Sequence, residues 1–320
     1  MVGLKRLPVF THAACFGHDT GPGHIETPAR LGAVVTALRD HVPGIEWLEA
    51  PRATRGQLLR VHEPLLLHAV LETDPDHLMQ LDPDTVLSPG SPEAALRAAG
   101  AVVAAVDRVM AGEADAAFCA VRPPGHHATP AHAMGFCLFN NVAVGAAHAL
   151  ERHGLSRIAI IDFDVHHGNG TQAIFAGEGR VLYASAHEMP LFPETGDPRE
   201  RGVGNIHNAA LQPGSGSHRF REAWRERLLP AIDAFEPQLL MVSAGFDGHR
   251  ADPAAHVELE ADDFAWLTCE LAGIAARHCG GRMVSVLEGG YDLAALAECS
   301  LAHVRALVAN GASGQRAPPT

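Results

Sequence analysis

Ile158-Ala-Ile-Ile-Asp-Phe-Asp-Val-His-His-Gly-Asn-Gly-Thr171 is the stretch that decides the fold of this chain. It begins with four apolar residues in a row, a pattern typical of a strand buried on both faces of a sheet. Because side chains alternate along a strand, Asp162, Asp164 and His166 are predicted to share one face near the strand end. Two carboxylates and an imidazole are costly to bury unless a cation or hydrogen bonds satisfy them. Since ligands of open α/β sheets bind beyond the carboxyl ends of the strands, the stretch predicts a metal site at a strand end.

Apolar runs and helical patterns alternate along the rest of the chain, which indicates a parallel sheet with helices on both faces. Residues 73–91 are rich in Asp and Pro and are predicted to form a surface loop. No linker or internal repeat interrupts the pattern, so we expect one domain over residues 1–309, followed by a frayed tail at 310–320. The predicted strands are 7–10, 45–48, 116–121, 158–162, 181–185, 239–244 and 283–287, and the main predicted helices are 28–41, 91–110, 141–151, 220–234, 262–278 and 293–308.

Composition restricts the class of protein. The chain has 320 residues, a net charge of −13 and a single lysine, Lys5, so direct binding to nucleic acid is not expected. An acidic surface would attract cationic substrates such as basic peptide tails or polyamines, although solubility alone explains it equally well. No apolar run approaches the roughly 20 residues of a membrane span, and the N-terminus does not resemble a signal peptide. A cytoplasmic location without membrane attachment is the default expectation.

Cysteines and isolated histidines give weaker signals. The six cysteines are scattered without a CxxC pair, which fits reduced, mostly buried thiols. Most of the 21 histidines have no potential partner nearby in sequence, and a histidine without converging partners seldom has a chemical role. We expect these histidines to lie on helix surfaces, among them His41, His68, His148, His153 and His303.

Three more predicted strands end in polar residues. Arg122-Pro-Pro-Gly-His-His-Ala128 follows one strand, Ser243-Ala-Gly-Phe-Asp247 ends another, and Glu288-Gly-Gly-Tyr291 follows a third. A parallel sheet brings all these ends to one rim, where such a concentration of chemical groups favours an active site over four unrelated structural features.

The residue types at this rim favour metal-assisted hydrolysis. Asp164, His166 and Asp247 would supply three ligands and leave an open position, the pattern of a catalytic site for Zn²⁺, with Fe²⁺ or Co²⁺ as alternatives. The metal would polarise a carbonyl and lower the pKa of bound water from about 16 toward about 7. His126 and His127 are the candidates for moving protons, and Asp162 could fix the tautomer of one of them. Tyr291 could donate a hydrogen bond to a developing oxyanion.

These motifs together resemble the histone deacetylase superfamily, zinc-dependent amidohydrolases of the arginase/deacetylase fold. The resemblance runs from roughly His12 to Leu301, and Asn169 with Ser243-Ala-Gly-Phe-Asp247 is similar to the class II branch and its bacterial relatives. It implies a single-domain, three-layer α/β fold whose central, mostly parallel, eight-stranded sheet is flanked by helices. It also implies an amidohydrolase that removes acetyl or other acyl groups from Nε-acyl-lysine in proteins or peptides.

The resemblance assigns roles residue by residue. His127 would be the general base, His126 backed by Asp162 would assist it, and Tyr291 would be the catalytic tyrosine. Asn169 stands behind His127, where class I members have a carboxylate, and a neutral amide would raise the pKa of that histidine less. Arg30 matches an arginine beside an internal acetate channel. The remaining implied residues are the Zn²⁺ ligands Asp164, His166 and Asp247, the substrate-tunnel residues Gly135, Phe136, Phe192, Ala254 and Gly289, and the structural K⁺ cage of Asp162, Asp164, His166, Ser185 and Ala186.

The chain departs from the family pattern at Ile25 and at Ala254, and the second departure bears on the substrate. Ile25 replaces the first proline of the His-Pro-Glu-x-Pro-x-Arg box. Ala254 stands where class II lysine deacetylases usually carry Leu and polyamine deacetylases carry a gatekeeper Glu. Alanine removes the carboxylate that would select a second ammonium group, which counts against a polyamine substrate.

Four functions remain open from the sequence. The first is a deacylase for acyl-lysine, and the second is a hydrolase for acylpolyamines or other small amides. The third is a ureohydrolase with two Mn²⁺ ions, against which Asn169 and the lack of a further Asp pair near Asp247 argue. The fourth is a binding module without turnover, which the intact Tyr291 and histidine pair make less favourable. The sequence indicates no oligomeric state.

Overall fold

An eight-stranded parallel sheet forms the centre of the computed structural model, which describes residues 6–73 and 75–311. All seven pairs of neighbouring strands are parallel. The strand between Ile158 and Asp162 is buried along its whole length, as its apolar run predicted. In sheet order the strands are β2 (Ile45–Glu49), β1 (Leu7–Thr11), β5 (Ala116–Cys119), β10 (Met283–Leu287), β9 (Leu239–Ala244), β6 (Ile158–Asp162), β7 (Val181–Glu188) and β8 (Ile206–Leu211).

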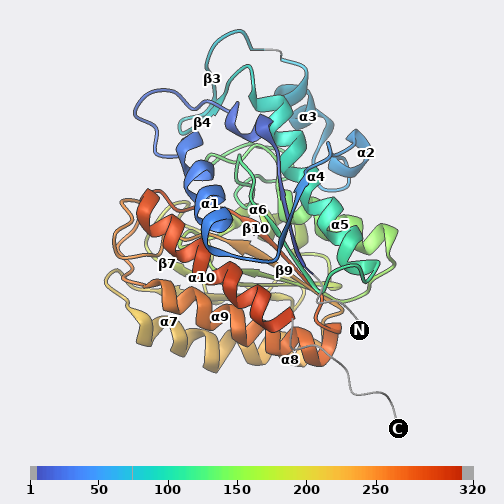
Figure 1. The fold of residues 1–320 in the computed structure, drawn as a ribbon, viewed down its shortest axis with the longest axis vertical. Helices are drawn as coiled ribbons and strands as arrows, with labels where there is room; N and C mark the ends of the chain where they lie inside the picture. Colours follow the sequence, from blue (N-terminus) through green and yellow to red (C-terminus); the bar gives the residue numbers. More distant parts are fainter. Residues whose placement is uncertain (1–5, 74, 312–320) are drawn as a thin grey trace.

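Helices cover the sheet as two layers (Figure 1). The helix pair over residues 91–110 and 141–152 forms part of one layer, and the C-terminal helix lies between the helices over residues 28–41 and 261–274 in the other. The helices are α1 (Pro28–His41), α2 (Arg55–Leu58), α3 (Pro64–Leu71), α4 (Ser91–Met110), α5 (Asn141–Arg152), α6 (Asn169–Phe175), α7 (Ser217–Ala223), α8 (Leu229–Phe235), α9 (Ala261–Ile274) and α10 (Leu293–Gly311).

Local sequence explains helix α4, the longest in the described part of the chain. Helix α4 is rich in alanine, the residue with the highest helix propensity, and Pro92 lies in its first turn, where a missing N–H is tolerated. A Cβ at Gly100 would lie 2.0 Å from the carbonyl oxygen of Pro51. The glycine therefore allows the preceding loop to pack directly against the helix.

The predicted fold class is confirmed, with differences at the periphery. Strand β8 was not predicted; it lies at the edge of the sheet, and its sequence, Ile-His-Asn-Ala-Ala-Leu, is only partly apolar. The segment predicted as a surface loop at residues 73–91 contains a hairpin of β3 (Met79–Asp82) and β4 (Thr85–Leu87). The helix predicted at residues 220–234 begins at Ser217 and includes a π-helical turn at Trp224–Leu228 between α7 and α8.

The prediction that the isolated histidines lie on helix surfaces is wrong for His148 and His303, both of which are buried. His303 lies 2.6 Å from the hydroxyl of Thr268 and 2.8 Å from that of Ser285. These hydroxyls satisfy both ring nitrogens, so the helical pattern of α10 accommodates a polar side chain in the core.

The C-terminal boundary stays a prediction. Helix α10 continues to Gly311, and residues 312–320 of the expected tail lie outside the described residues. Within the described part of the chain, no helix combines the length and apolar character needed to cross a membrane.

Candidate active site

The carboxyl ends of β5, β10, β9 and β6 bring the four motifs to one rim of the sheet. Asp162 at the end of β6 pairs in register with Ser243 of β9, and Ser243 pairs with Val286 of β10. Val286 in turn pairs with Cys119 of β5, three residues before Arg122. The parallel register therefore places the segments that follow these strands side by side.

Asp164, His166 and Asp247 converge as the sequence predicted, with one potential ligand atom of each within 4.8 Å of the others. Nδ1 of His166 lies 3.1 Å from Oδ1 of Asp164 and 3.0 Å from Oδ2 of Asp247. Burial acts to lower the pKa of His166, but its hydrogen bonds to the two carboxylates raise it to about 10. Burial and the neighbouring Asp164 raise the pKa of Asp247 to about 7. The cluster thus concentrates negative charge out of water, where a cation would compensate it.

Two glycines allow the backbone to approach these carboxylates. A Cβ at Gly245 would lie 2.0 Å from Oδ2 of Asp164, and a Cβ at Gly289 would lie 2.1 Å from Oδ2 of Asp247. The Gly289 N–H instead donates to Oδ2 of Asp164 at 2.8 Å. Two carboxylates and an imidazole in such a cradle fit a divalent ion such as Zn²⁺. Gly289, expected in the substrate tunnel, therefore lies against the ligand cluster.

The two adjacent histidines have opposite electrostatic environments. Nδ1 of His126 lies 3.1 Å from Oδ2 of Asp162; burial opposes charge on this ring, but Asp164 and Asp162 raise its pKa to about 10. His127 has its pKa lowered well below the ordinary 6.5 by burial and by the neighbouring His126 and His166. The pair therefore combines a charged imidazolium with a neutral imidazole.

Asn169 fixes the orientation of His127. Its Oδ1 lies 2.8 Å from Nδ1 of His127, and its amide nitrogen donates to Sδ of Met134 at 3.3 Å. With the amide oriented in this way, Nδ1 of His127 donates its hydrogen and Nε2 is left as an acceptor. A Cβ at Gly135 would lie 2.4 Å from the His127 ring, so this glycine is needed for the ring to occupy its place.

Tyr291 is held from two sides. The Arg30 guanidinium lies 4.8 Å from the centroid of the Tyr291 ring, and the backbone N–H of Tyr291 donates to Oδ2 of Asp252 at 2.6 Å. Burial and the charge of Asp247 raise the pKa of the phenol well above 10. The phenol is therefore a protonated hydrogen-bond donor at neutral pH.

A buried ion cluster, which the sequence did not predict, supports the Tyr291 loop. The Glu26 carboxylate accepts hydrogen bonds from Arg30 at 2.8 Å and from Arg122 at 2.6 Å. Arg30 also donates to the carbonyl oxygens of Glu288 and Gly290. Glu26 is the glutamate of the segment that matches the His-Pro-Glu-x-Pro-x-Arg box, and Arg122 begins the Arg122–Ala128 motif. Their separation of 96 residues hides the pairing.

Glu288 is a second missed residue. Its Oε2 accepts from the N–H groups of Gly125 at 2.6 Å and His126 at 3.1 Å, and its Oε1 accepts from Ser243 at 3.1 Å. Burial raises its pKa to about 7. Glu288 thereby joins three of the four motifs and positions the backbone of the histidine pair.

A cavity of ≈ 230 Å³ opens over these groups. The rings of His127 and Phe192 pack edge to face with centroids 5.1 Å apart, and those of Phe136 and Tyr291 do so at 5.8 Å. Asp84 was missed because its hairpin was predicted as a loop; its Oδ1 accepts from the Gly135 N–H at 3.1 Å. The lining residues are Ile25, Asp84, His127, Gly135, Phe136, His166, Phe192, Ala254 and Tyr291.

The remaining polar residues of the motifs have structural partners. His167 lies 2.7 Å from Oγ1 of Thr195 and 2.9 Å from Oε1 of Gln172, away from the ligand cluster. Asp252 accepts from the N–H groups of Tyr291, Asp292 and Ala254. Asp252 therefore serves the loops around the cavity. Among the described residues, no second group of three potential metal ligands lies next to Asp164, His166 and Asp247.

Known proteins resemble this chain in sequence and in fold. The family model for the histone deacetylase domain matches residues 24–307. The histone deacetylase-like amidohydrolase of Pseudomonas aeruginosa is 39% identical over 330 residues, covering 95% of this chain and 86% of that protein. The polyamine deacetylase HDAC10 of Homo sapiens is 39% identical over 315 residues, covering 92% of this chain and 45% of that protein. The crystal structure of the HDA15 HD domain superposes with a TM-score of 0.91 at 32% identity, covering 96% and 89% of the two chains. This chain therefore belongs to the histone deacetylase family of hydrolases.

Proposed function

We propose that this protein removes acetyl or other acyl groups from Nε-acyl-lysine in proteins or peptides, with Zn²⁺ held by Asp164, His166 and Asp247. One observation carries the proposal: His166, which converges with the buried Asp164 and Asp247, lines the same cavity as His127, Tyr291 and two phenylalanines. Family membership supports the reaction class. The choice of metal and substrate is our inference from the ligand chemistry and the cavity walls.

The chain's own groups suit the hydrolysis of an amide. A bound Zn²⁺ would supply Lewis acidity to the carbonyl and make water easier to deprotonate. His127, kept neutral, accepts the proton of the attacking water through Nε2. His126, kept protonated by Asp162 and Asp164, is suited to stabilise the developing charge or to supply the proton that the departing amine needs. The C–N bond breaks, and the products are a carboxylic acid and the free lysine amine.

Tyr291 provides the oxyanion donor in this proposal. Because its pKa is raised well above 10, the phenol keeps its proton and can donate to the carbonyl oxygen as negative charge develops there. Asp252 and Arg30 are positioning residues, since they hold the backbone and the ring of Tyr291 without lining the cavity.

The cavity walls favour an alkyl chain that ends in an amide. Phe136 and Phe192 offer aromatic faces and edges to methylene groups, and Ala254 places no charge at the wall. A second candidate, hydrolysis of acylpolyamines, is favoured by Asp84, a carboxylate of the lining that could attract a distal ammonium group. One relative of this chain, from Homo sapiens, is named a polyamine deacetylase. The engagement of Asp84 with the Gly135 N–H makes acyl-lysine our first choice.

Side-by-side turnover of an acetyl-lysine peptide and acetylputrescine tests the choice. We expect a higher kcat/KM for the peptide, and faster turnover of acetylputrescine would contradict the acyl-lysine assignment. Metal analysis of Asp247→Ala tests the ligand set, because full occupancy in that variant would refute the role of Asp247.

Two accessory sites belong to the same proposal. Asp162 and Ser185 are register partners on β6 and β7, which supports a K⁺ cage formed with the carbonyl groups of Asp164, His166 and Ala186. Arg30 is buried beside Tyr291, which supports a place for it next to an internal product channel.

A further inference from the structure

Two helices bring a second group of ligand-type side chains together far from the catalytic cavity. Asp107 lies in the last turn of α4, His148 in the last part of α5, and His153 at the C-cap of α5. Asn140, the N-cap of α5, donates from its side chain to the carbonyl of His126, so His148 and His153 lie at the end of the helix remote from the histidine pair. One ligand atom of each lies within 4.8 Å of the others.

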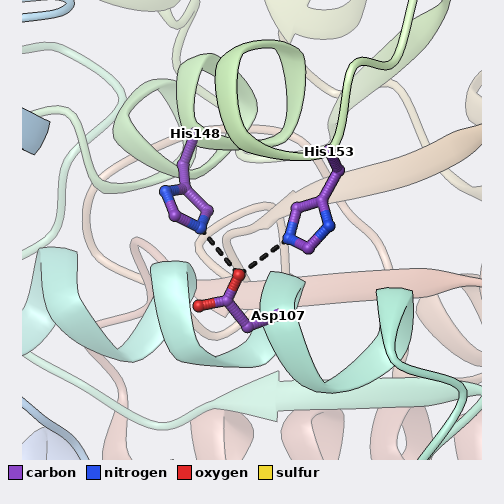
Figure 2. A group of neighbouring side chains, drawn as sticks. All are labelled: Asp107, His148 and His153. Carbon is purple, nitrogen blue, oxygen red and sulfur yellow. Dashed lines mark hydrogen bonds and ion pairs between the residues drawn. The ribbon is translucent and has the colours of Figure 1, made fainter.

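The three side chains point at one another, as Figure 2 shows. Oδ1 of Asp107 lies 2.7 Å from Nε2 of His148 and 2.7 Å from Nε2 of His153. Both imidazoles therefore converge on the same carboxylate oxygen, while Oδ2 is directed away from them. The arrangement presents two nitrogens and one oxygen toward a common point between α4 and α5.

We propose that Asp107, His148 and His153 form a second metal site, specific for late first-row divalent ions such as Zn²⁺ and separate from the catalytic trio. Two imidazoles and one carboxylate are ligands that such ions prefer, whereas Ca²⁺ and Mg²⁺ prefer oxygen alone. Bound metal would connect the C-terminal ends of α4 and α5.

The geometry requires only small movements. Ligands about 2.0–2.1 Å from a tetrahedral ion lie about 3.3 Å apart, so each imidazole would move away from Oδ1 by roughly half an ångström to admit the ion. The His148 side chain is 7% exposed and gives the site a fixed wall, whereas the Asp107 side chain is 50% exposed and leaves room for water to complete the coordination. His153 is 23% exposed and can adjust.

Arg60 provides a test that separates a metal site from a simple ion pair. Its Nη1 lies 3.2 Å from Nδ1 of His148. A guanidinium can only donate, so Nδ1 accepts here and Nε2 carries the hydrogen that faces Asp107. Metal binding at Nε2 would place that hydrogen on Nδ1, where it would face the N–H donor of Arg60. Arg60 therefore favours the tautomer that cannot bind metal at Nε2. Since metal-ligating histidines usually donate their other N–H to an acceptor, Arg60 should weaken the site and a residue with an acceptor there should strengthen it.

Calorimetric titration of the purified holoenzyme with Zn²⁺ is the experiment, with metal analysis after dialysis to count ions per chain. We expect the wild-type protein to bind a second, weaker equivalent beyond its catalytic metal. His153→Ala and Asp107→Asn should lower the affinity for the second ion by at least about 10- to 100-fold. That is the loss seen when only a hydrogen-bond partner of a metal ligand is removed. Arg60→Gln should tighten it.

His68→Ala is the matched control, because His68 is an exposed histidine that faces a single carboxylate, Glu72. It should bind two equivalents like the wild type. The proposal is overturned if the wild type takes up no second equivalent, if that equivalent survives in both His153→Ala and Asp107→Asn, or if Arg60→Gln weakens it. The readout is stoichiometry, so it stands whether or not the proposed substrate is correct.

Discussion

Replacing Asn169 by Asp should move the acidic limb of the pH profile to higher pH. The new carboxylate would occupy the place of an amide oxygen that lies 2.8 Å from Nδ1 of His127. A negative charge at such a distance raises the pKa of an imidazole by about 1–3 units. The upper end of this range, a rise of about three pKa units, corresponds to about 4 kcal/mol. This equals the interaction energy of two unit charges about 4 Å apart at an effective dielectric constant near 20. His127 is buried, so salt should screen the interaction only weakly.

The direction of the change follows from the role of His127 as a base. Only the neutral ring can accept a proton, and a raised pKa keeps the ring protonated to higher pH. The acidic limb of kcat/KM, which reports the free enzyme, should therefore shift upward by about 1–3 units.

The assay is kcat/KM for an acetyl-lysine peptide across pH 5 to 9, after metal content has been verified for each variant. Gln212→Glu is the control, since it adds the same charge at an exposed turn and should leave the limb unchanged. If folded, metal-loaded Asn169→Asp shows the wild-type limb, His127 is not the base whose protonation limits the reaction.

Three further predictions concern the oxyanion donor, the cavity wall and the buried ion cluster. Tyr291→Phe should lower kcat by about 10²–10³ while metal content is retained; unchanged turnover would contradict the donor role. Ala254→Glu should raise the ratio of acetylputrescine to peptide turnover about fivefold through an ion pair of about 1 kcal/mol, and Ala254→Gln should not. Burial opposes ionisation of Glu26, but Arg122 and Arg30 lower its pKa from 4.5 to about 2, so its stabilisation is complete above pH 4.5 and is lost as the pH falls toward 2. Urea unfolding should show a contribution of about 3 kcal/mol over that range, and a pH dependence unchanged in Glu26→Gln would refute it.

The sequence was sufficient to predict the groups that follow buried strands. Asp164, His166 and Asp247 could be anticipated because a parallel sheet brings its strand ends together, whatever their separation in the chain. The apolar run before Asp162 predicted strand β6, because a strand of a parallel sheet is buried on both faces. The walls of the cavity followed from the resemblance alone, because neither Phe136 nor Phe192 lies in a regular element whose period would indicate its direction.

Contacts between distant loops and helices could not be predicted in this way. Asp107 and His148 stand on different helices, and only the packing of α4 against α5 shows that they meet. Asp84 lies in a hairpin whose short strands give too little alternation to distinguish them from a loop. Glu26 was part of a quoted motif, but its partner Arg122 is 96 residues away. In each case the pairing depends on tertiary packing, which local periodicity does not encode.

The hydrogen bond from Arg30 to the Gly290 carbonyl spans 260 residues, and it has a consequence for how activity arises during synthesis. Helix α1, which carries Arg30, supports the loop that carries Tyr291, so this contact cannot form until the chain has been synthesised beyond Gly290. Closing so long a loop is among the slower kinds of folding event. We therefore expect ribosome-bound chains that stop short of β10 to be inactive even where β6 and β9 have already paired. A nick between α1 and β2 that leaves both fragments associated should preserve turnover, whereas removal of the segment up to Arg30 should abolish it.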